Sequence, residues 1–243
     1  YIYLNFSHYI NNSEIKIFSL DNIKISKFNN IFTNENFLIQ NFTPFQFRNF
    51  EDFEDFNLTE NERIKLTGKT LILPVSSPST SHFLFEGHGF LNSKFINEID
   101  NILITTSEIK GTVQLIKDTV GRDINIIFKP RGKNIYTLEN AIIPEYRFSL
   151  HSSQINNLNI IKQKYLSNKN YFIYISRRDV KNKPRALLNE KEIEEMFKKF
   201  NFEVLYLQEM HQKDIFDKFV NAKFIAGSLG AGLYNAVFSN KNP

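Results

Sequence analysis

In the last third of the sequence, short apolar runs alternate with amphipathic segments, and this pattern restricts the fold more than any other feature. The runs at residues 171–175, 203–207 and 223–226 are typical of buried strands. A helix between the first two opens at Asn189 and Glu192, which form a capping-box pair, and a second helix precedes the third run. Parallel strands require such crossover segments, so the alternation predicts βαβ units around a parallel sheet.

The same alternation starts upstream, near residue 69. Strand-like runs occupy residues 70–75, 101–105 and 124–128. A helix is predicted across residues 82–96, although Gly87 and Gly89 are expected to weaken it and to break it early. Ser107 is a suitable N-cap for another helix. The chain is therefore predicted to have an α/β fold along most of its length.

Two domains are expected within the 243 residues. Residues 1–150 read as an α/β domain with a β-rich leader, because the first 60 residues alternate β-prone runs with Asn-rich turns. A polar helical segment at residues 144–167 reads as the crossover to a Rossmann-like domain over residues 151–243. The chain begins at Tyr1 without an initiator Met, and we expect it to be a piece of a longer protein.

Composition excludes several classes of chemistry. With 42% hydrophobic and 23% charged residues the chain is typical of globular proteins, and no apolar run approaches the roughly 18–20 residues of a membrane-spanning helix. The absence of cysteine rules out disulfide scaffolds, thiolate zinc sites and cysteine nucleophiles. The net charge of +4 is spread without long runs of like sign, so no nucleic-acid partner is expected. The histidines are scattered and no D-x-D motif occurs, so no metal is expected.

A glycine-rich turn, Gly227–Gly232, follows the last strand and precedes a helical segment at Leu233. Glycines there let backbone N–H groups approach a phosphate at a helix N-terminus. Arg177 and Arg185, after an earlier strand, could place guanidinium groups on phosphate oxygens, because ligands of open α/β sheets bind at the carboxyl ends of strands. A turn without a ligand and a solvated basic loop are the alternative interpretations.

The pair formed by His82 and Glu86 is another candidate for chemistry. Four residues apart on a helix, the imidazole and the carboxylate share one face and can form an ion pair. Such a pair suits a general base whose partner orients it. A purely structural His–Glu pair is the alternative interpretation.

Together these segments resemble glycosyltransferase family 61, whose bacterial members include capsular polysaccharide biosynthesis proteins. The resemblance covers roughly residues 70–238 and is most specific in its C-terminal part. The positions that carry it are His82, Phe83, Leu84 and Glu86, then Ser176, Arg177, Arg185, Asn189 and Glu190, and finally Gly230, Ala231, Gly232, Leu233 and Asn235.

The resemblance implies a GT-B architecture, in which two Rossmann-like domains face a cleft, with the second domain incomplete at its C-terminus here. It implies an inverting, metal-independent transfer of a sugar from a nucleotide-sugar donor to a hydroxyl of a glycan acceptor, with no cofactor. His82 or Glu86 would be the catalytic base. The donor-binding residues would be Arg177, Arg185, Asn189, Glu190, Gly230, Ala231, Gly232 and Asn235.

One position departs from the family pattern, because Leu229 occupies the place of the usual His before Gly-Ala-Gly. This leaves an alternative function, a non-catalytic nucleotide- or sugar-binding module of a larger polysaccharide synthase. For the enzyme we expect a role in bacterial capsule or surface polysaccharide synthesis. We expect a cytoplasmic location at the inner face of the plasma membrane, with peripheral membrane or polysaccharide-assembly partners.

Overall fold

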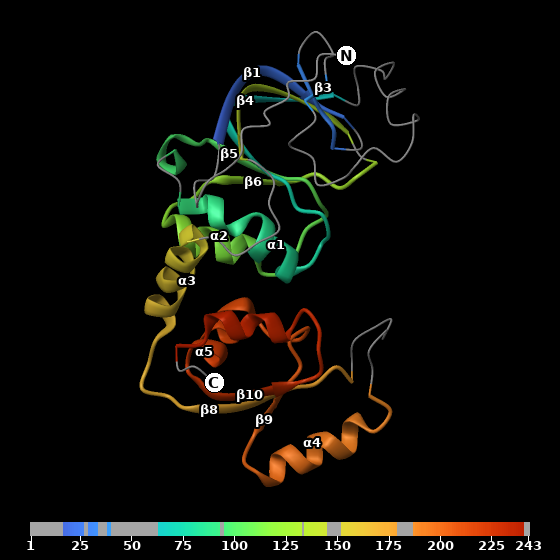
Figure 1. Ribbon diagram of the computed structural model, residues 1–243, viewed down its shortest axis with the longest axis vertical. Helices are drawn as coiled ribbons and strands as arrows, with labels where there is room; N and C mark the ends of the chain where they lie inside the picture. The colour runs from blue at the N-terminus through green and yellow to red at the C-terminus, as the bar shows by residue number, and fades with distance from the viewer. Residues whose placement is uncertain are drawn as a thin grey trace. The chain divides into compact units, whose positions relative to one another are not determined.

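A computed structural model describes residues 17–26, 29–33, 38–39, 63–92, 95–132, 134–144, 152–178 and 187–240. The chain divides into two compact units. The first contains residues 1–78, 82–109 and 120–155, and the second contains residues 79–81, 110–119 and 156–243. The predicted α/β class is confirmed, since strands and helices alternate in both units (Figure 1). A domain boundary between residues 150 and 151 stays a prediction.

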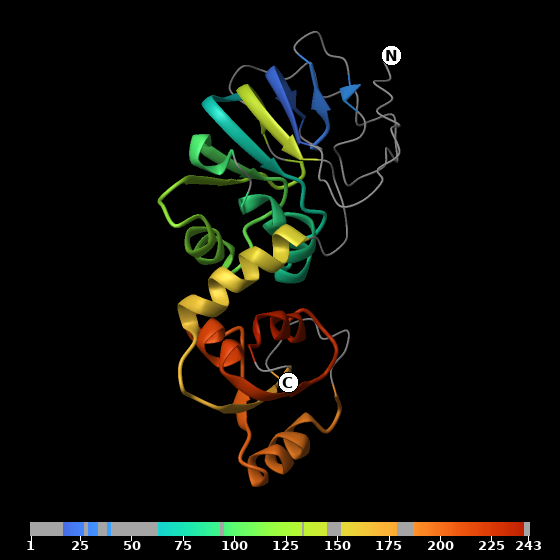
Figure 2. The ribbon, with the colours of Figure 1, turned by 60° about the vertical axis from the view of Figure 1, so that its left-hand side comes forward.

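The first unit is built on a seven-stranded sheet with the order β3-β2-β1-β7-β4-β5-β6. Its strands are β1 (Ile17–Ile25), β2 (Ile31–Phe32), β3 (Leu38–Ile39), β4 (Arg63–Leu73), β5 (Asn101–Ile104), β6 (Asn125–Phe128) and β7 (Ile135–Pro144). Strands β7, β4, β5 and β6 run parallel, whereas β1 is antiparallel to β7 and to β2. Figure 2 shows β4, β7 and β1 side by side in teal, yellow-green and blue. The sheet is therefore mixed, and the prediction of a parallel sheet is right only for its second half.

Strand β4 lies at the point where the order of the parallel strands reverses. It pairs with β5, the next parallel strand in the chain, on one side, and with β7, the last, on the other. Its second half is completely buried, as are the facing residues of β5, because both faces of a parallel sheet are covered. Ligands of open α/β sheets bind outside the carboxyl ends of the strands at such a reversal. The loop after Leu73 is therefore the part of the first unit best placed for a site.

The helix predicted over residues 82–96 is wrong in its extent, and it breaks early, as the glycines at positions 87 and 89 predict. The structure has α1 (Thr80–Glu86), followed by the short 3-10 helices η4 (His88–Asn92) and η5 (Ile96–Glu98). Glycine at position 87 interrupts the helix, because it is a poor helix former. The Ser107 cap is also wrong, since α2 (Thr112–Val120) begins only after Gly111, whose φ of +80° is incompatible with a helix.

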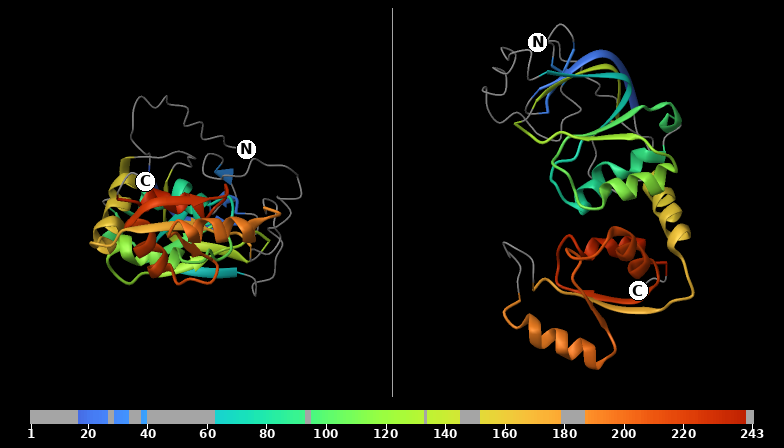
Figure 3. Two further views of the ribbon diagram at one scale, coloured as in Figure 1. Left: turned by 90° about the horizontal axis from the view of Figure 1, so that it is seen from below. Right: turned by 180° about the vertical axis from the view of Figure 1, so that it is seen from behind.

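The second unit contains the three-stranded parallel sheet β10-β8-β9, as the alternation predicts. Its elements are β8 (Tyr171–Ile175), α4 (Glu190–Lys199), β9 (Glu203–Leu205), α5 (Gln212–Val220), β10 (Ala222–Gly227) and the 3-10 helix η6 (Leu233–Phe238). Helix α3 (Ser152–Tyr165) begins in the first unit and continues into the second. Figure 3 shows α4 on one face of this sheet and α5 with η6 on the other. None of the helices in the described ranges has the length and hydropathy of a membrane span.

Two local predictions fail in this unit. The Asn189 side chain makes no capping hydrogen bond at the start of α4, so the capping box does not form. The segment after the glycine-rich turn is a 3-10 helix of six residues. A short 3-10 helix has poorer hydrogen-bond geometry than an α-helix, so the partial positive charge expected at its N-terminus is weaker than predicted.

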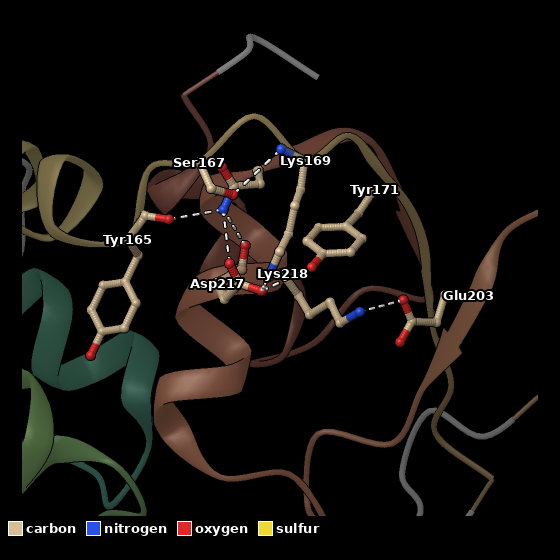
Figure 4. Close-up of polar contacts among 8 residues, drawn as sticks. Tyr165, Ser167, Lys169, Tyr171, Glu203, Asp217 and Lys218 are labelled. Atoms are coloured by element: carbon tan, nitrogen blue, oxygen red, sulfur yellow. Dashed lines mark hydrogen bonds and ion pairs between the residues drawn. The ribbon is translucent and has the colours of Figure 1, made fainter.

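A buried amide holds the connection between α3 and β8 onto α5 (Figure 4). Asn221, which is completely buried, accepts the Ser167 N–H at 2.7 Å and donates to the Tyr165 carbonyl at 2.9 Å. It also donates to the backbone carbonyl and the carboxylate of Asp217. That carboxylate in turn accepts the Tyr171 hydroxyl at 2.9 Å. The network fixes the entry of β8 into the sheet.

Candidate active site

The first cluster of polar side chains follows the carboxyl end of β4. The chain leaves the strand at Leu73, and the N–H of Val75 donates to the Thr105 hydroxyl at 3.0 Å, which ties the loop to the end of β5. Ser76 comes next, and α1 then carries His82 and Glu86 on one face. The loop and the helix therefore bring three polar side chains together at this end of the sheet.

In this cluster, Glu86 accepts hydrogen bonds from both of the other residues. The Ser76 hydroxyl donates to Oε1 at 2.6 Å and the Ser76 N–H donates to Oε2. Nδ1 of His82 lies 2.6 Å from Oε1 of Glu86 and 2.9 Å from the Ser76 hydroxyl. The predicted pairing of His82 with Glu86 across one helical turn is confirmed.

The geometry excludes one chemistry and permits another. In a serine hydrolase the serine and the carboxylate contact opposite nitrogens of the histidine. Here Ser76 and Glu86 both contact Nδ1, so the histidine does not lie between them and Ser76 is not placed as an activated nucleophile. The His82 side chain is 35% exposed and the Glu86 side chain is fully buried, an arrangement that suits a histidine oriented by a carboxylate.

The second unit carries its own cluster at the carboxyl ends of β8 and β10. These strands are neighbours, with Ile175 opposite Gly227 at their ends. Because β9 lies on the other side of β8, the order of the strands reverses between β8 and β10. Arg177 follows β8, and its guanidinium lies against Gly230, where a β-carbon would overlap Nη1. Glycine at position 230 therefore leaves room for the guanidinium, which a side chain there would displace.

Several atoms of this cluster are buried and have no hydrogen-bond partner among the residues that the structure describes. Glu190 uses one carboxylate oxygen to accept the Tyr174 hydroxyl at 2.7 Å, and Asn235 donates to the Gly232 carbonyl at 2.9 Å. Burying a polar group without a partner costs about 1–3 kcal/mol, so such atoms point to a ligand. The unpartnered atoms are Arg177 Nε, Glu190 Oε2, Ser228 Oγ and Asn235 Oδ1.

The remaining predicted site residues have varied positions. Asn189 and Ala231 are exposed, on the turns that precede α4 and η6. Gly232 lies close to the core, where a β-carbon would be 2.9 Å from Leu207 Cδ1. Leu229, at the position of the family histidine, is 65% exposed. Arg185 lies outside the described residues.

The adjacent arginines after β8 are not equivalent. Nη1 of Arg178 lies 3.0 Å from Glu194 and Nη2 donates to the Tyr206 hydroxyl at 2.8 Å, so this side chain is held by an ion pair within the unit. Arg177 has no such ion pair among the described contacts. Arg177 is therefore the arginine suited to an anionic ligand.

Comparison with known families identifies the kind of protein that contains these two polar clusters. A profile of the family Glycosyltransferase 61 matches residues 69–242, about seven-tenths of the chain. The chain belongs to glycosyltransferase family 61. The protein is therefore a glycosyltransferase, which binds a sugar donor and an acceptor. A search among curated proteins found no significant match.

The family match includes both clusters, and each contains a residue that sequence reasoning missed. The Ser76 hydroxyl donates to a carboxylate, and the Ser228 hydroxyl is buried. Ser76 lies in a serine-rich turn and Ser228 in a glycine-rich turn, where serine is common. The signal that could have identified them is their position one to three residues after the end of a parallel strand. In the described part of the chain, no group of three or more His, Asp or Glu side chains could hold a metal ion.

Proposed function

We propose that this family 61 protein transfers a sugar from a nucleotide-sugar donor to a hydroxyl of a glycan acceptor, and that the second unit binds the nucleotide. The observation that carries the proposal is the set of buried, unpartnered atoms at the carboxyl ends of β8 and β10. Arg177 Nε offers a donor, whereas Glu190 Oε2 and Asn235 Oδ1 offer acceptors. A nucleotide supplies both complements, because its phosphates accept hydrogen bonds and its ribose hydroxyls donate them.

In this proposal, the charged diphosphate and the neutral hydroxyls of the nucleotide sugar contact different residues. The diphosphate lies toward Arg177 and the Gly230–Gly232 backbone, where fixed positive charge and N–H groups stabilise the departing anion. Glu190 repels phosphate, so its acceptor oxygen suits a neutral hydroxyl of the donor. Asn189, on the turn before α4, contributes to this donor site, and Arg185, outside the described residues, stays a donor-binding residue expected from the sequence.

The reaction we propose is a single displacement with inversion at the anomeric carbon, without a metal. A base from the His82–Glu86 pair removes the proton of the acceptor hydroxyl, which attacks as the diphosphate leaves. The two units would form a GT-B arrangement. We further propose a role in bacterial capsule or surface polysaccharide synthesis at the cytoplasmic face of the membrane.

Nucleotide binding by Arg177→Ala tests the donor site. A panel of nucleotides and nucleotide sugars is screened against the intact protein by thermal shift, and the best ligand is titrated by calorimetry. The variant should bind about 10- to 100-fold more weakly, because charged hydrogen bonds contribute about 1.5–3 kcal/mol. Lys191→Ala removes a positive charge from an exposed position on α4 and should bind normally. Unchanged affinity of Arg177→Ala would remove the arginine from the site.

Leu229 supports a second candidate function, a nucleotide-binding module that does not catalyse transfer. Its exposed apolar side chain replaces an imidazole that could bond to the donor. Incubation of the intact protein with the nucleotide sugar that binds best separates the two functions. Released nucleoside diphosphate supports the enzyme, and binding without release supports the module.

A further inference from the structure

The contacts around Glu86 determine where the His82 imidazole carries its proton. The carboxylate has no proton to give when it is ionised, and three donors surround it. Nδ1 of His82 therefore donates to Oε1. In the neutral imidazole the other nitrogen, Nε2, then has the lone pair. The arrangement selects one of the two histidine tautomers.

Exposure separates the two candidate bases. The Glu86 side chain is fully buried, and both of its oxygens already accept hydrogen bonds from Ser76 or His82. An acceptor hydroxyl therefore has no route to the carboxylate. The His82 side chain is 35% exposed. Of the two side chains, only the imidazole is reached by solvent.

Ser76 adds a constraint that neither of the other residues provides. Its backbone N–H can only donate a hydrogen bond, so the atom of residue 86 that faces it must be an acceptor. Its hydroxyl, which faces the other oxygen, can donate or accept. Ser76 thus fixes which end of the side chain at position 86 meets the backbone and which end meets His82.

We propose that Ser76 and Glu86 are positioning residues that hold the proton on Nδ1 of His82, so that Nε2 is the base. The proposal rests on the transferase function proposed above. In the reaction, Nε2 takes the proton of the acceptor hydroxyl, whose oxygen forms a bond to the anomeric carbon of the nucleotide sugar. The bond from that carbon to the diphosphate breaks, and the diphosphate leaves with the electron pair. Glu86 stabilises the imidazolium that results.

The substitution Glu86→Gln gives the sharpest test, because Ser76 dictates how the amide fits. The Ser76 N–H requires the amide oxygen at the Oε2 position, and this turns the NH₂ group toward Nδ1 of His82. The NH₂ then donates to Nδ1, and the imidazole proton moves to Nε2. Size and hydrogen-bond count are kept, but the basic nitrogen faces the wrong way.

The tautomer is measured without any substrate. Intact protein labelled with ¹⁵N in histidine is examined by long-range ¹H–¹⁵N correlation at alkaline pH, and the His82 signals are assigned from His82→Gln. Wild-type protein and Glu108→Gln, a substitution at an exposed glutamate in the same unit, should show protonated Nδ1 and bare Nε2. Glu86→Gln should show the reverse. Protonated Nδ1 in Glu86→Gln would overturn the proposal.

Turnover of the nucleotide sugar identified by the binding screen supplies the second measurement. His82→Ala and Glu86→Gln should each lose about 10²- to 10⁴-fold in kcat while nucleotide affinity stays unchanged. The double variant should be no slower than His82→Ala, because the two residues act as a unit. If Glu86 were the base, His82→Ala would keep most of its turnover while Glu86→Gln lost it. A wild-type protein that shows the expected tautomer but no turnover overturns the transferase function instead.

Discussion

A histidine in the interior of the first unit gives the protein a sensitivity to acid that is independent of its active site. His88 opens η4 directly after Gly87 and is completely buried, with its ring centroid 6.2 Å from that of Phe83. Burial lowers the pKa of His88 from 6.5 to about 3, because the charged imidazolium is poorly solvated there. The folded protein therefore holds this side chain neutral.

We expect the free energy of unfolding to fall as the pH drops from 6.5, because the unfolded chain binds the proton of His88 first. The stabilisation is complete above this value and is lost progressively toward pH 3. The loss is about 2 kcal/mol by about pH 5, at roughly 1.4 kcal/mol per pH unit. Urea unfolding between about pH 7.5 and about pH 5 measures it.

His88→Gln should flatten this dependence on pH, whatever it does to the stability at neutral pH. His211→Gln is the matched control, because His211 is exposed at the start of α5. The prediction is contradicted if His88→Gln and the wild-type protein lose the same free energy over this range.

Among the elements, the connection between α3 and β8 depends on one side chain rather than on regular structure. Asn221 at the end of α5 makes four hydrogen bonds, to Tyr165, Ser167 and Asp217. Around it, Lys169 lies 3.0 Å from Asp217, and Lys218 lies over the Tyr171 ring at 3.9 Å. The exposed ion pair between Lys169 and Asp217 contributes little to stability. The buried amide of Asn221 is therefore the main interaction that holds the connection.

Asn221→Leu should destabilise the second unit by about 2–4 kcal/mol. The substitution keeps the volume but leaves buried backbone groups without partners. Chemical denaturation of the intact protein measures the change. Asn168→Ala removes an exposed amide from the same connection and should stay within about 0.5 kcal/mol of the wild type. Equal stabilities of the two variants would show that the Asn221 network does not fasten the connection.

The elements predicted correctly from the sequence are those with a strong periodicity of apolar residues and clear turn residues at their ends. Strands β8 and β10 and helix α5 follow the predicted pattern, because apolar runs and amphipathic spacing are local properties. The antiparallel pairing of β1 with β7 joins segments more than 100 residues apart, and no local pattern encodes it. The start of α2 depends on the positive φ of Gly111, which the spacing of apolar residues does not reveal.

At the level of the whole chain, the two clusters lie in separate compact units, and each is at the carboxyl end of a strand reversal. The sequence predicted His82, Glu86 and Arg177 because their spacing and position after strands are visible in one dimension. It missed Ser76, whose role comes from a hydrogen bond between a loop and the following helix. Polar contacts of this kind depend on tertiary distances, which a single sequence does not contain.

Hydrogen exchange of the intact protein should localise the nucleotide in one unit. At about 100 times its dissociation constant, a bound nucleotide adds about 2.7 kcal/mol, so amides that open locally should exchange about 100-fold more slowly. We expect this protection in the turns after β8 and β10, at Arg177 and Ser228, and not in the sheet of the first unit. Arg177→Ala should lose most of this protection at the same nucleotide concentration. Protection confined to the first unit would place the nucleotide elsewhere.

The close approach of Gly230 to Arg177 also links the histories of the two positions. While the arginine is kept, a residue with a β-carbon at position 230 displaces the guanidinium from this place, so glycine preserves the close approach. In a relative that has lost the arginine, position 230 is released and can accept alanine or serine. The two positions should therefore vary together across relatives, with glycine at position 230 most frequent where the arginine is kept.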